Sequence, residues 1–217
     1  MCVTSGTDSR CASGRALRRR AAAGPEPAGA TAWGAVAWLA LLAVAPIAQA
    51  ASCETLLEPF ASDCTRLVDT YVNGRNAVVI PGYSYHLPFT WSPARRAQLN
   101  KNAWGLGLVR TTEDPDGDTH SVYALVFRDS HKHAQWNLGY EYATYWGPRS
   151  GLQPGLGYTA LIVQRPDIFG GAPFPALLPI ASLRYRDATL SATWIPTLNG
   201  GLNHGSTVFV FGRVVLE

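Results

Sequence analysis

From residue 78 onward the chain repeats short segments in which apolar side chains alternate with small or polar ones at a period of two. Turn-forming residues separate the segments, as in PDGD at 115–118 and NGG at 199–201. Most have about the nine to eleven residues that a tilted strand needs to cross a bilayer. The pattern predicts eight strands, over residues 78–91, 104–113, 119–129, 134–146, 154–165, 176–186, 188–196 and 206–216.

The alternation gives most of these segments a bulky apolar face and a second face of smaller side chains. In the fourth segment Trp136 and Leu138 alternate with Asn137 and Gly139. This is the pattern of a closed barrel whose outside meets lipid, whereas a soluble calyx would bury its apolar face inside. Aromatic side chains near segment ends are typical of the membrane interface: Trp91, Trp104, Trp136, Tyr145, Trp146 and Trp194. We predict an all-β protein, an eight-stranded antiparallel transmembrane β-barrel.

Residues 1–50 have the three zones of a secretory signal. A basic stretch includes Arg18–Arg20, an apolar run follows over 32–48, and the small-residue pattern AQA occupies 48–50. We expect cleavage near residue 50. A membrane anchor is the alternative, but the run is short for a span and contains Pro46. The long stretch before the apolar run leaves the true start codon open.

Residues 51–77 are expected to form a short amphipathic helix with a linker, on the periplasmic side of a barrel over 78–217. The two cysteines of this region, Cys53 and Cys64, would enter an oxidising compartment where they could pair. A continuous helix through both would hold them too far apart to bond. A disulfide therefore requires the helix to begin after Cys53.

The net charge of +3 belongs to the predicted leader. The leader holds five of the 18 Lys and Arg residues and two of the 15 Asp and Glu residues, which leaves 13 of each. A neutral mature chain has no basic field, and this argues against nucleic acid as a partner.

Several segments carry a family resemblance. IPGYSYH at 80–86, WGLGLV at 104–109, YALVFRDS at 123–130, PALLPIASLRY at 175–185 and IPTLNGG at 195–201 are similar, in order and spacing, to motifs of the lipid A palmitoyltransferases of Gram-negative outer membranes, the PagP family. The resemblance implies an eight-stranded outer-membrane barrel, preceded by an amphipathic helix, that moves a palmitoyl chain from a glycerophospholipid to lipid A. It implies no cofactor, and we expect a monomer.

By this resemblance His86, Asp129 and Ser130 form the catalytic set. Acyl transfer needs a hydroxyl activated by a base, and histidine accepts a proton near neutral pH. Either Ser130 attacks and an acyl-enzyme forms, or His86 activates the lipid A hydroxyl directly. Strand parity predicts that His86 and Ser130 point inward, the latter together with Ala124 and Val126. Asp129 falls on the opposite face of its strand, and its geometry is unexplained.

Other positions are implied by the same resemblance. Pro81, Pro179 and Pro196 match prolines that open the family's barrel laterally, because proline cannot donate a ladder hydrogen bond. A fourth expected proline is Ala103 here. Arg95 coincides with a position for lipopolysaccharide recognition, and Gly139, with Glu141 beside it on the same face, lies at the floor of the acyl pocket. Asn199 stands at the gating position, where the family has a tyrosine.

Glu141 departs from the family pattern, because a carboxyl group in an apolar cavity is costly without a partner. It predicts either a pocket for chains shorter than palmitate or a partner that the sequence does not reveal. His131 and His133 could bind metal, but two histidines without a third ligand predict no metal site. The competing hypotheses are a non-catalytic small barrel, for adhesion or hydrophobic transport, and a soluble lipid-binding calyx.

Overall fold

The structure is a computed structural model that describes Cys53, residues 60–198 and residues 203–216. It contains the helices α2 (Phe60–Asn73) and α3 (Pro93–Gln98), the short 3₁₀ helix η2 (Phe169–Gly171), and the strands β1 (Arg75–His86), β2 (Gly105–Glu113), β3 (Thr119–Arg128), β4 (Ala134–Tyr145), β5 (Leu152–Gln164), β6 (Phe174–Tyr185), β7 (Ala188–Ile195) and β8 (Thr207–Val215). The helix before the barrel and the eight strands were both predicted, and both predictions are confirmed.

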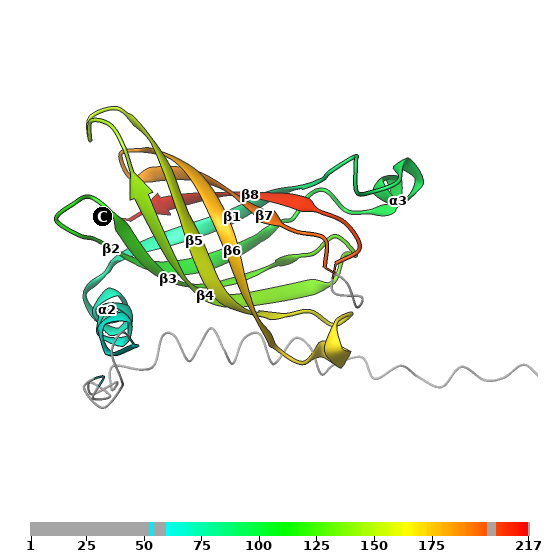
Figure 1. Cartoon of the computed structure of the whole chain (residues 1–217), viewed down its shortest axis with the longest axis horizontal. Helices are drawn as coiled ribbons and strands as arrows, with labels where there is room; N and C mark the ends of the chain where they lie inside the picture. The colour runs from blue at the N-terminus through cyan, green and yellow to red at the C-terminus, as the bar shows by residue number, and fades with distance from the viewer. Residues whose placement is uncertain (1–52, 54–59, 199–202, 217) are drawn as a thin grey trace, which may run out of the picture.

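Each strand pairs antiparallel with the next one in sequence, and β8 pairs with β1 to close the barrel. In Figure 1 helix α2 lies at one end of the barrel and α3 at the other, and we name these the α2 end and the α3 end. Odd-numbered strands run from the α2 end to the α3 end. The connections that join β1 to β2, β3 to β4, β5 to β6 and β7 to β8 therefore gather at the α3 end.

The first strand ends at His86 rather than near residue 91, because a short helix follows it. Pro93 occupies the first turn of α3, where a missing N–H costs nothing, and the Ser92 side chain accepts a hydrogen bond from the Arg95 N–H. A register shift between Pro81 and Tyr83 marks a bulge within β1. After this bulge the even-numbered residues Ser84 and His86 are buried.

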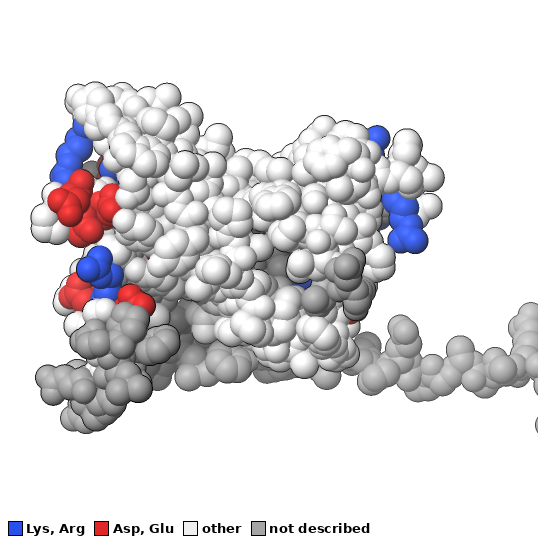
Figure 2. Space-filling model, in the orientation of Figure 1, with Lys and Arg blue, Asp and Glu red and all other residues white. Residues whose placement is uncertain are grey.

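The barrel presents a broad uncharged surface between charged ends (Figure 2). Large apolar side chains cover the outside, and Trp104 and Leu177 are each 70% exposed. The third strand corrects one expectation about its faces. The sequence predicted that Ala124 and Val126 face inward. In the structure Tyr123, Leu125 and Phe127 line the interior cavity instead. Both faces of this strand are apolar, so alternation alone could not tell inside from outside.

The interior of the α2 half is polar. Arg213 donates hydrogen bonds to Glu141 and Ser121, and Ser121 bonds to Thr111. Nearer the α2 end, Arg184 donates to the Gln153 side chain at 2.9 Å. Buried polar groups that satisfy one another in this way hold the strands in register without an apolar core.

Helix α2 packs against the ends of β2 and β3. Its Arg66 Nη1 lies 2.9 Å from His120 Nε2, and the Thr70 hydroxyl bonds to the Thr112 hydroxyl at 3.0 Å. Cys53 and Cys64 form a disulfide with a Cα–Cα distance of 5.7 Å. The pairing that the sequence left open is therefore present, with the helix beginning after Cys53. Among the described residues, no helix is both long and apolar enough to cross a membrane.

Candidate active site

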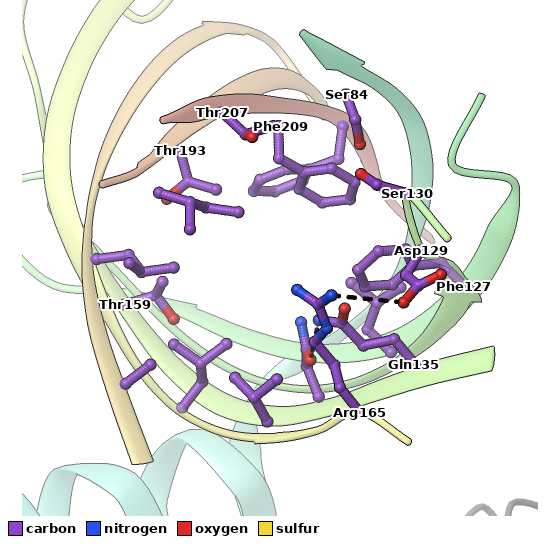
Figure 3. A pocket seen from close by; sticks show the side chains of 18 of the residues that line it. Ser84, Phe127, Asp129, Ser130, Gln135, Thr159, Arg165, Thr193, Thr207 and Phe209 are labelled. Atoms are coloured by element: carbon purple, nitrogen blue, oxygen red, sulfur yellow. Dashed lines mark hydrogen bonds and ion pairs between the residues drawn. The ribbon is translucent and has the colours of Figure 1, made fainter. Parts of the chain in front are cut away.

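An elongated apolar cavity of about 170 Å³ occupies the α3 half of the barrel. Its walls come from residues of all eight strands and the adjoining loops, and 14 of the 31 lining residues are valine, leucine, isoleucine or phenylalanine (Figure 3). His86 and Ser130 lie where it opens toward the α3 end, and Glu141 and Arg213 close it toward the polar half. The shape and lining suit a hydrocarbon chain whose polar head remains near His86 and Ser130.

His86 and Ser130 are in direct contact. The His86 Nε2 atom lies 2.9 Å from the Ser130 Oγ atom, within hydrogen-bond distance. The His86 side chain is buried and meets the edge of the Trp91 ring at a centroid distance of 5.5 Å. Trp91 is itself held by a hydrogen bond from its Nε1 to the Ser206 carbonyl, and Gly205 leaves room for the indole ring. Strand β1 and the loop before β8 thus position the imidazole.

Asp129 does not orient His86. Its Oδ1 accepts the backbone N–H groups of His131 at 2.9 Å and His133 at 2.7 Å, while its Oδ2 lies 3.7 Å from Arg165 Nη2. The His86 Nδ1 atom is buried without a hydrogen-bond partner in the part of the chain that the structure describes. Asp129 therefore shapes the turn that carries Ser130, and this is not the arrangement of a Ser-His-Asp triad.

Ser130 lines the cavity as parity predicted, but the placement of Asp129 on the opposite face was wrong, because Asp129 lines the cavity too. Asp129 continues the inward face of Leu125 and Phe127. Strict alternation from these residues would place Ser130 on the opposite face. Strand β3 ends at Arg128, so the turn after it is free to bring Ser130 onto His86. Period-two reasoning does not extend beyond the last residue of a strand.

Arg165 is a site residue that the sequence analysis missed. It follows β5 directly, and Figure 3 shows its side chain projecting into the cavity mouth, joined to Asp129 by a dashed line. It also donates hydrogen bonds to Asp167 from Nε at 3.1 Å and from Nη2 at 2.7 Å. Partial burial raises the pKa of Asp167, but these bonds and the charge of Arg165 outweigh that effect and hold the pKa below its usual range.

The cavity floor contains the partner that Glu141 was predicted to need. Arg213 Nη1 lies 3.0 Å from Glu141 Oε1, and both side chains are almost fully buried. Gly139 lies beside them, where a Cβ atom would come within 2.6 Å of the Tyr123 hydroxyl. That hydroxyl bonds to Thr159 at 2.7 Å. The floor is thus closed by hydrogen-bonded polar groups.

Two gaps in the strand ladder lie near the predicted prolines. The β1–β2 ladder stops at the pair Val79 and Gly107, just before Pro81. The β6–β7 ladder extends no further toward the α3 end than the pair of Ile180 and Thr193, next to Pro179. Pro196 follows the last residue of β7.

The β1–β2 gap is partly bridged. The Ala103 N–H donates to the Gly82 carbonyl at 3.1 Å, and the Ser84 N–H donates to the Lys101 carbonyl at 2.8 Å. A proline at position 103 could not make the first of these bonds. The alanine therefore closes part of a gap that proline would leave open.

The remaining predicted positions lie around the mouth or outside the described residues. Arg95 lies on α3 and is exposed, and Asn199 falls outside the described residues. Ligand-type atoms of Asp129, His133 and Asp167 lie within 4.8 Å of one another, which resembles a metal site. However, the Arg165 guanidinium contacts both carboxylates of this group and already supplies a cation.

Comparison with known proteins places the chain in a family. The family model for the antimicrobial peptide resistance and lipid A acylation protein PagP matches residues 66–213. A protein of Methylobacillus flagellatus, named Lipid A acyltransferase PagP, is 37% identical over 171 residues, which are 79% of this chain and 91% of that protein.

Proteins with the same name from Bordetella parapertussis and Legionella pneumophila are similar over most of their length. The first is 36% identical and covers 76% of this chain and 90% of its own. The second is 33% identical and covers 75% of this chain and 83% of its own. The chain belongs to the PagP family of lipid A acylation proteins.

Proposed function

We propose that this protein is an outer-membrane acyltransferase that moves a palmitoyl-sized chain from a glycerophospholipid to a hydroxyl group of lipid A. The observation that carries the proposal is the hydrogen bond between His86 and Ser130 at the mouth of a long apolar cavity. Relatives named lipid A acyltransferases support the same reaction. A passive barrel for adhesion or hydrophobic transport would account for the strands but not for this buried histidine–serine pair.

The pair supports two routes of acyl transfer. In the first, Ser130 Oγ attacks the donor ester carbonyl while His86 Nε2 takes its proton and then passes it to the leaving lysophospholipid. The lipid A hydroxyl attacks the acyl-serine in turn. In the second, His86 takes the proton of the lipid A hydroxyl, which attacks the donor ester directly while Ser130 holds the imidazole; His86 then passes the proton to the leaving lysophospholipid. Both routes transfer the acyl group without a cofactor.

The length of the cavity suits a long acyl chain. Along β3, Asp129 lies eight residues beyond Ser121, which pairs with Glu141. At about 3.3 Å per residue and a tilt near 40°, this separation is roughly 20 Å along the barrel axis. An extended palmitoyl chain is of similar length, so the Glu141–Arg213 floor is compatible with a palmitoyl donor and does not require a shorter one.

The surface supports an outer-membrane location. Large apolar side chains face outward, the surface between the charged ends is uncharged (Figure 2), and closure leaves no free sheet edge apart from the two ladder gaps. With both barrel termini at the periplasmic side, the α3 end lies at the cell surface, where lipid A is found. Lipids would enter the cavity sideways through the gaps beside Pro81 and Pro179, and a monomer suffices for the reaction.

Purified protein in detergent micelles tests the proposal. We expect it to convert lipid A and a glycerophospholipid labelled in one acyl chain into labelled lipid A and lysophospholipid in equal amounts. Intact-protein mass measured with donor alone separates the two routes, because only the first adds one acyl mass, and Ser130→Ala removes that mass. Release of free fatty acid without lipid A acylation would contradict the proposed transfer.

A further inference from the structure

A second cavity lies at the α3 end, directly beside the mouth of the acyl cavity. It has a volume of about 480 Å³ and shares Trp91, His131, Arg165 and Asn203 with the acyl cavity. The two spaces are therefore neighbours that share part of one wall. A lipid with its chain in the first cavity would place its polar head in the second.

Five of the ten residues that line this second cavity are Arg, Lys or His, and one is acidic. Arg95, Lys132 and Arg165 contribute three permanent positive charges, and His131 and His204 are also part of the wall. Asp167 is the acidic residue among the described lining residues. It is already engaged with Arg165 through two hydrogen bonds, and the charges of Arg95 and Lys132 are not offset by it.

The charge of the whole α3 end has the same sign. The connections between paired strands at this end carry five Lys and Arg residues and two Asp residues. The connections at the α2 end carry four Asp residues and two Arg residues. In Figure 2 the basic side chains over α3 form the charged edge of this end. The asymmetry favours an anionic ligand at the α3 end only.

The side chain of one basic residue and the backbone of another are held in place. The Arg165 guanidinium is clamped between Asp167 and Asp129, which fixes it where the two cavities meet. Lys132 has a left-handed backbone, with φ of 69°, in the turn that Asp129 caps. This conformation is costly for a residue with a side chain, and the cap imposes it. The turn that carries Ser130 thus also presents Lys132 to the second cavity.

We propose that the second cavity binds the phosphate group of a lipid substrate and so aligns that lipid with His86 and Ser130. Arg165 and Lys132 supply the charged donors, and a ring N–H of His204 supplies a further hydrogen-bond donor. This assignment rests on the proposed acyl transfer and extends it to residues beyond Arg95. Phosphate is common to lipid A and to the glycerophospholipid donor, and the experiment separates these two sources.

Direct binding tests the proposal without relying on activity. Dodecyl phosphate is titrated calorimetrically into the protein held in dodecyl maltoside micelles. We expect Lys132→Gln combined with His204→Ala to weaken binding about tenfold, since one charge-assisted hydrogen bond is worth at least about 1.5 kcal/mol. The single variant Lys132→Arg keeps the positive charge at this position and should keep most of the wild-type affinity. Arg186→Ala removes a charge at the α2 end and is the matched control. Equal dissociation constants for the wild type and the double variant would overturn the proposal.

Turnover then identifies the source of the phosphate. For the lipid whose phosphate group occupies the cavity, we expect the KM of the double variant to be about tenfold above the wild-type value. Its kcat should stay within about twofold of the wild-type value, because the lost interaction serves binding. If the KM effect disappears with a dephosphorylated lipid A, the acceptor occupies the cavity. If it disappears with a diacylglycerol donor, the donor does. A KM effect that persists without either phosphate would overturn the proposal. A wild type that binds dodecyl phosphate but acylates nothing would refute the proposed function and leave the phosphate site standing.

Discussion

At the scale of single residues, the site depends on how the chain turns after β3. The burial of His86 was predictable because it lies within a strand, where period two holds up to the last residue. The places of Asp129 and Ser130 were not predictable, because β3 ends at Arg128. Arg165 was missed for a similar reason, since a single arginine after a strand gives no sequence signal that it turns inward.

The contacts of Asp129 predict a graded response to substitution. Asp129→Asn keeps an oxygen that can accept the N–H groups of His131 and His133 but loses the charge opposite Arg165. We expect kcat to fall about tenfold, whereas loss of the aspartate that orients a triad histidine costs about 10⁴-fold. Asp129→Ala also loses the turn cap and should be the more damaging change. Acylation rates of the two purified variants provide the measurement, and a loss near 10⁴-fold in Asp129→Asn would support a triad instead.

At the scale of elements, the ends and pairings of the strands decide where the barrel opens. Strand positions were predictable from period two and turn residues. Helix α3 was not, because six residues are too few to show helical periodicity. The ladder gap beside Pro81 follows from the chemistry of proline, but the bridge from Ala103 to Gly82 became visible only in the structure.

That bridge predicts that lipid entry between β1 and β2 is restricted. Ala103→Pro removes the hydrogen bond to the Gly82 carbonyl, at a stability cost of about 1 kcal/mol. We expect faster capture of lipid through this side, seen as a higher kcat/KM, with little change in single-turnover chemistry. Ala103→Gly, which keeps the N–H group, is the matched control. If both variants increase kcat/KM equally, the hydrogen bond does not limit entry.

A second prediction at this scale concerns the turn between β2 and β3. The Tyr142 hydroxyl donates to Asp118, and this bond, with a smaller contribution from Thr144, lowers the pKa of Asp118 below its usual range. A lowered pKa stabilises the folded state at pH values above about 4, and the stabilisation is lost as the pH falls. Asp118→Asn should therefore unfold more easily in urea at pH 7, by less than about 1 kcal/mol because the turn is solvated. The difference should shrink near pH 3; a difference that is unchanged at pH 3 would contradict this assignment.

At the scale of the whole molecule, the interior is divided into a polar half and an apolar half at the Glu141–Arg213 pair. The sequence indicated that Glu141 needs a partner but could not identify it, because Arg213 is 72 residues away and the two meet only when the barrel closes. The same closure brings all eight strands to one cavity. Family motifs predicted the residues around this cavity, whereas the contacts across it depend on the barrel geometry.

The buried pair gives a stability prediction. Arg213→Leu leaves the Glu141 carboxylate without its partner and should lower the free energy of unfolding by about 3–5 kcal/mol. Glu141→Leu combined with Arg213→Leu removes both charges and should recover most of that loss. Equilibrium unfolding in urea within detergent micelles measures both variants. Equal losses in the single and double variants would show that packing, not charge pairing, dominates at this position.

The most direct test of the proposed function is the lipid A of a Gram-negative host that lacks this activity, after expression of the full chain. We expect mass spectra to show lipid A with one added acyl chain for the wild type and for the control Ser150→Ala. We expect no added chain for His86→Ala or Ser130→Ala, provided that each variant is present in the outer membrane at the wild-type level. Unmodified lipid A from the wild type, or equal acylation by all four proteins, would contradict the roles proposed for His86 and Ser130.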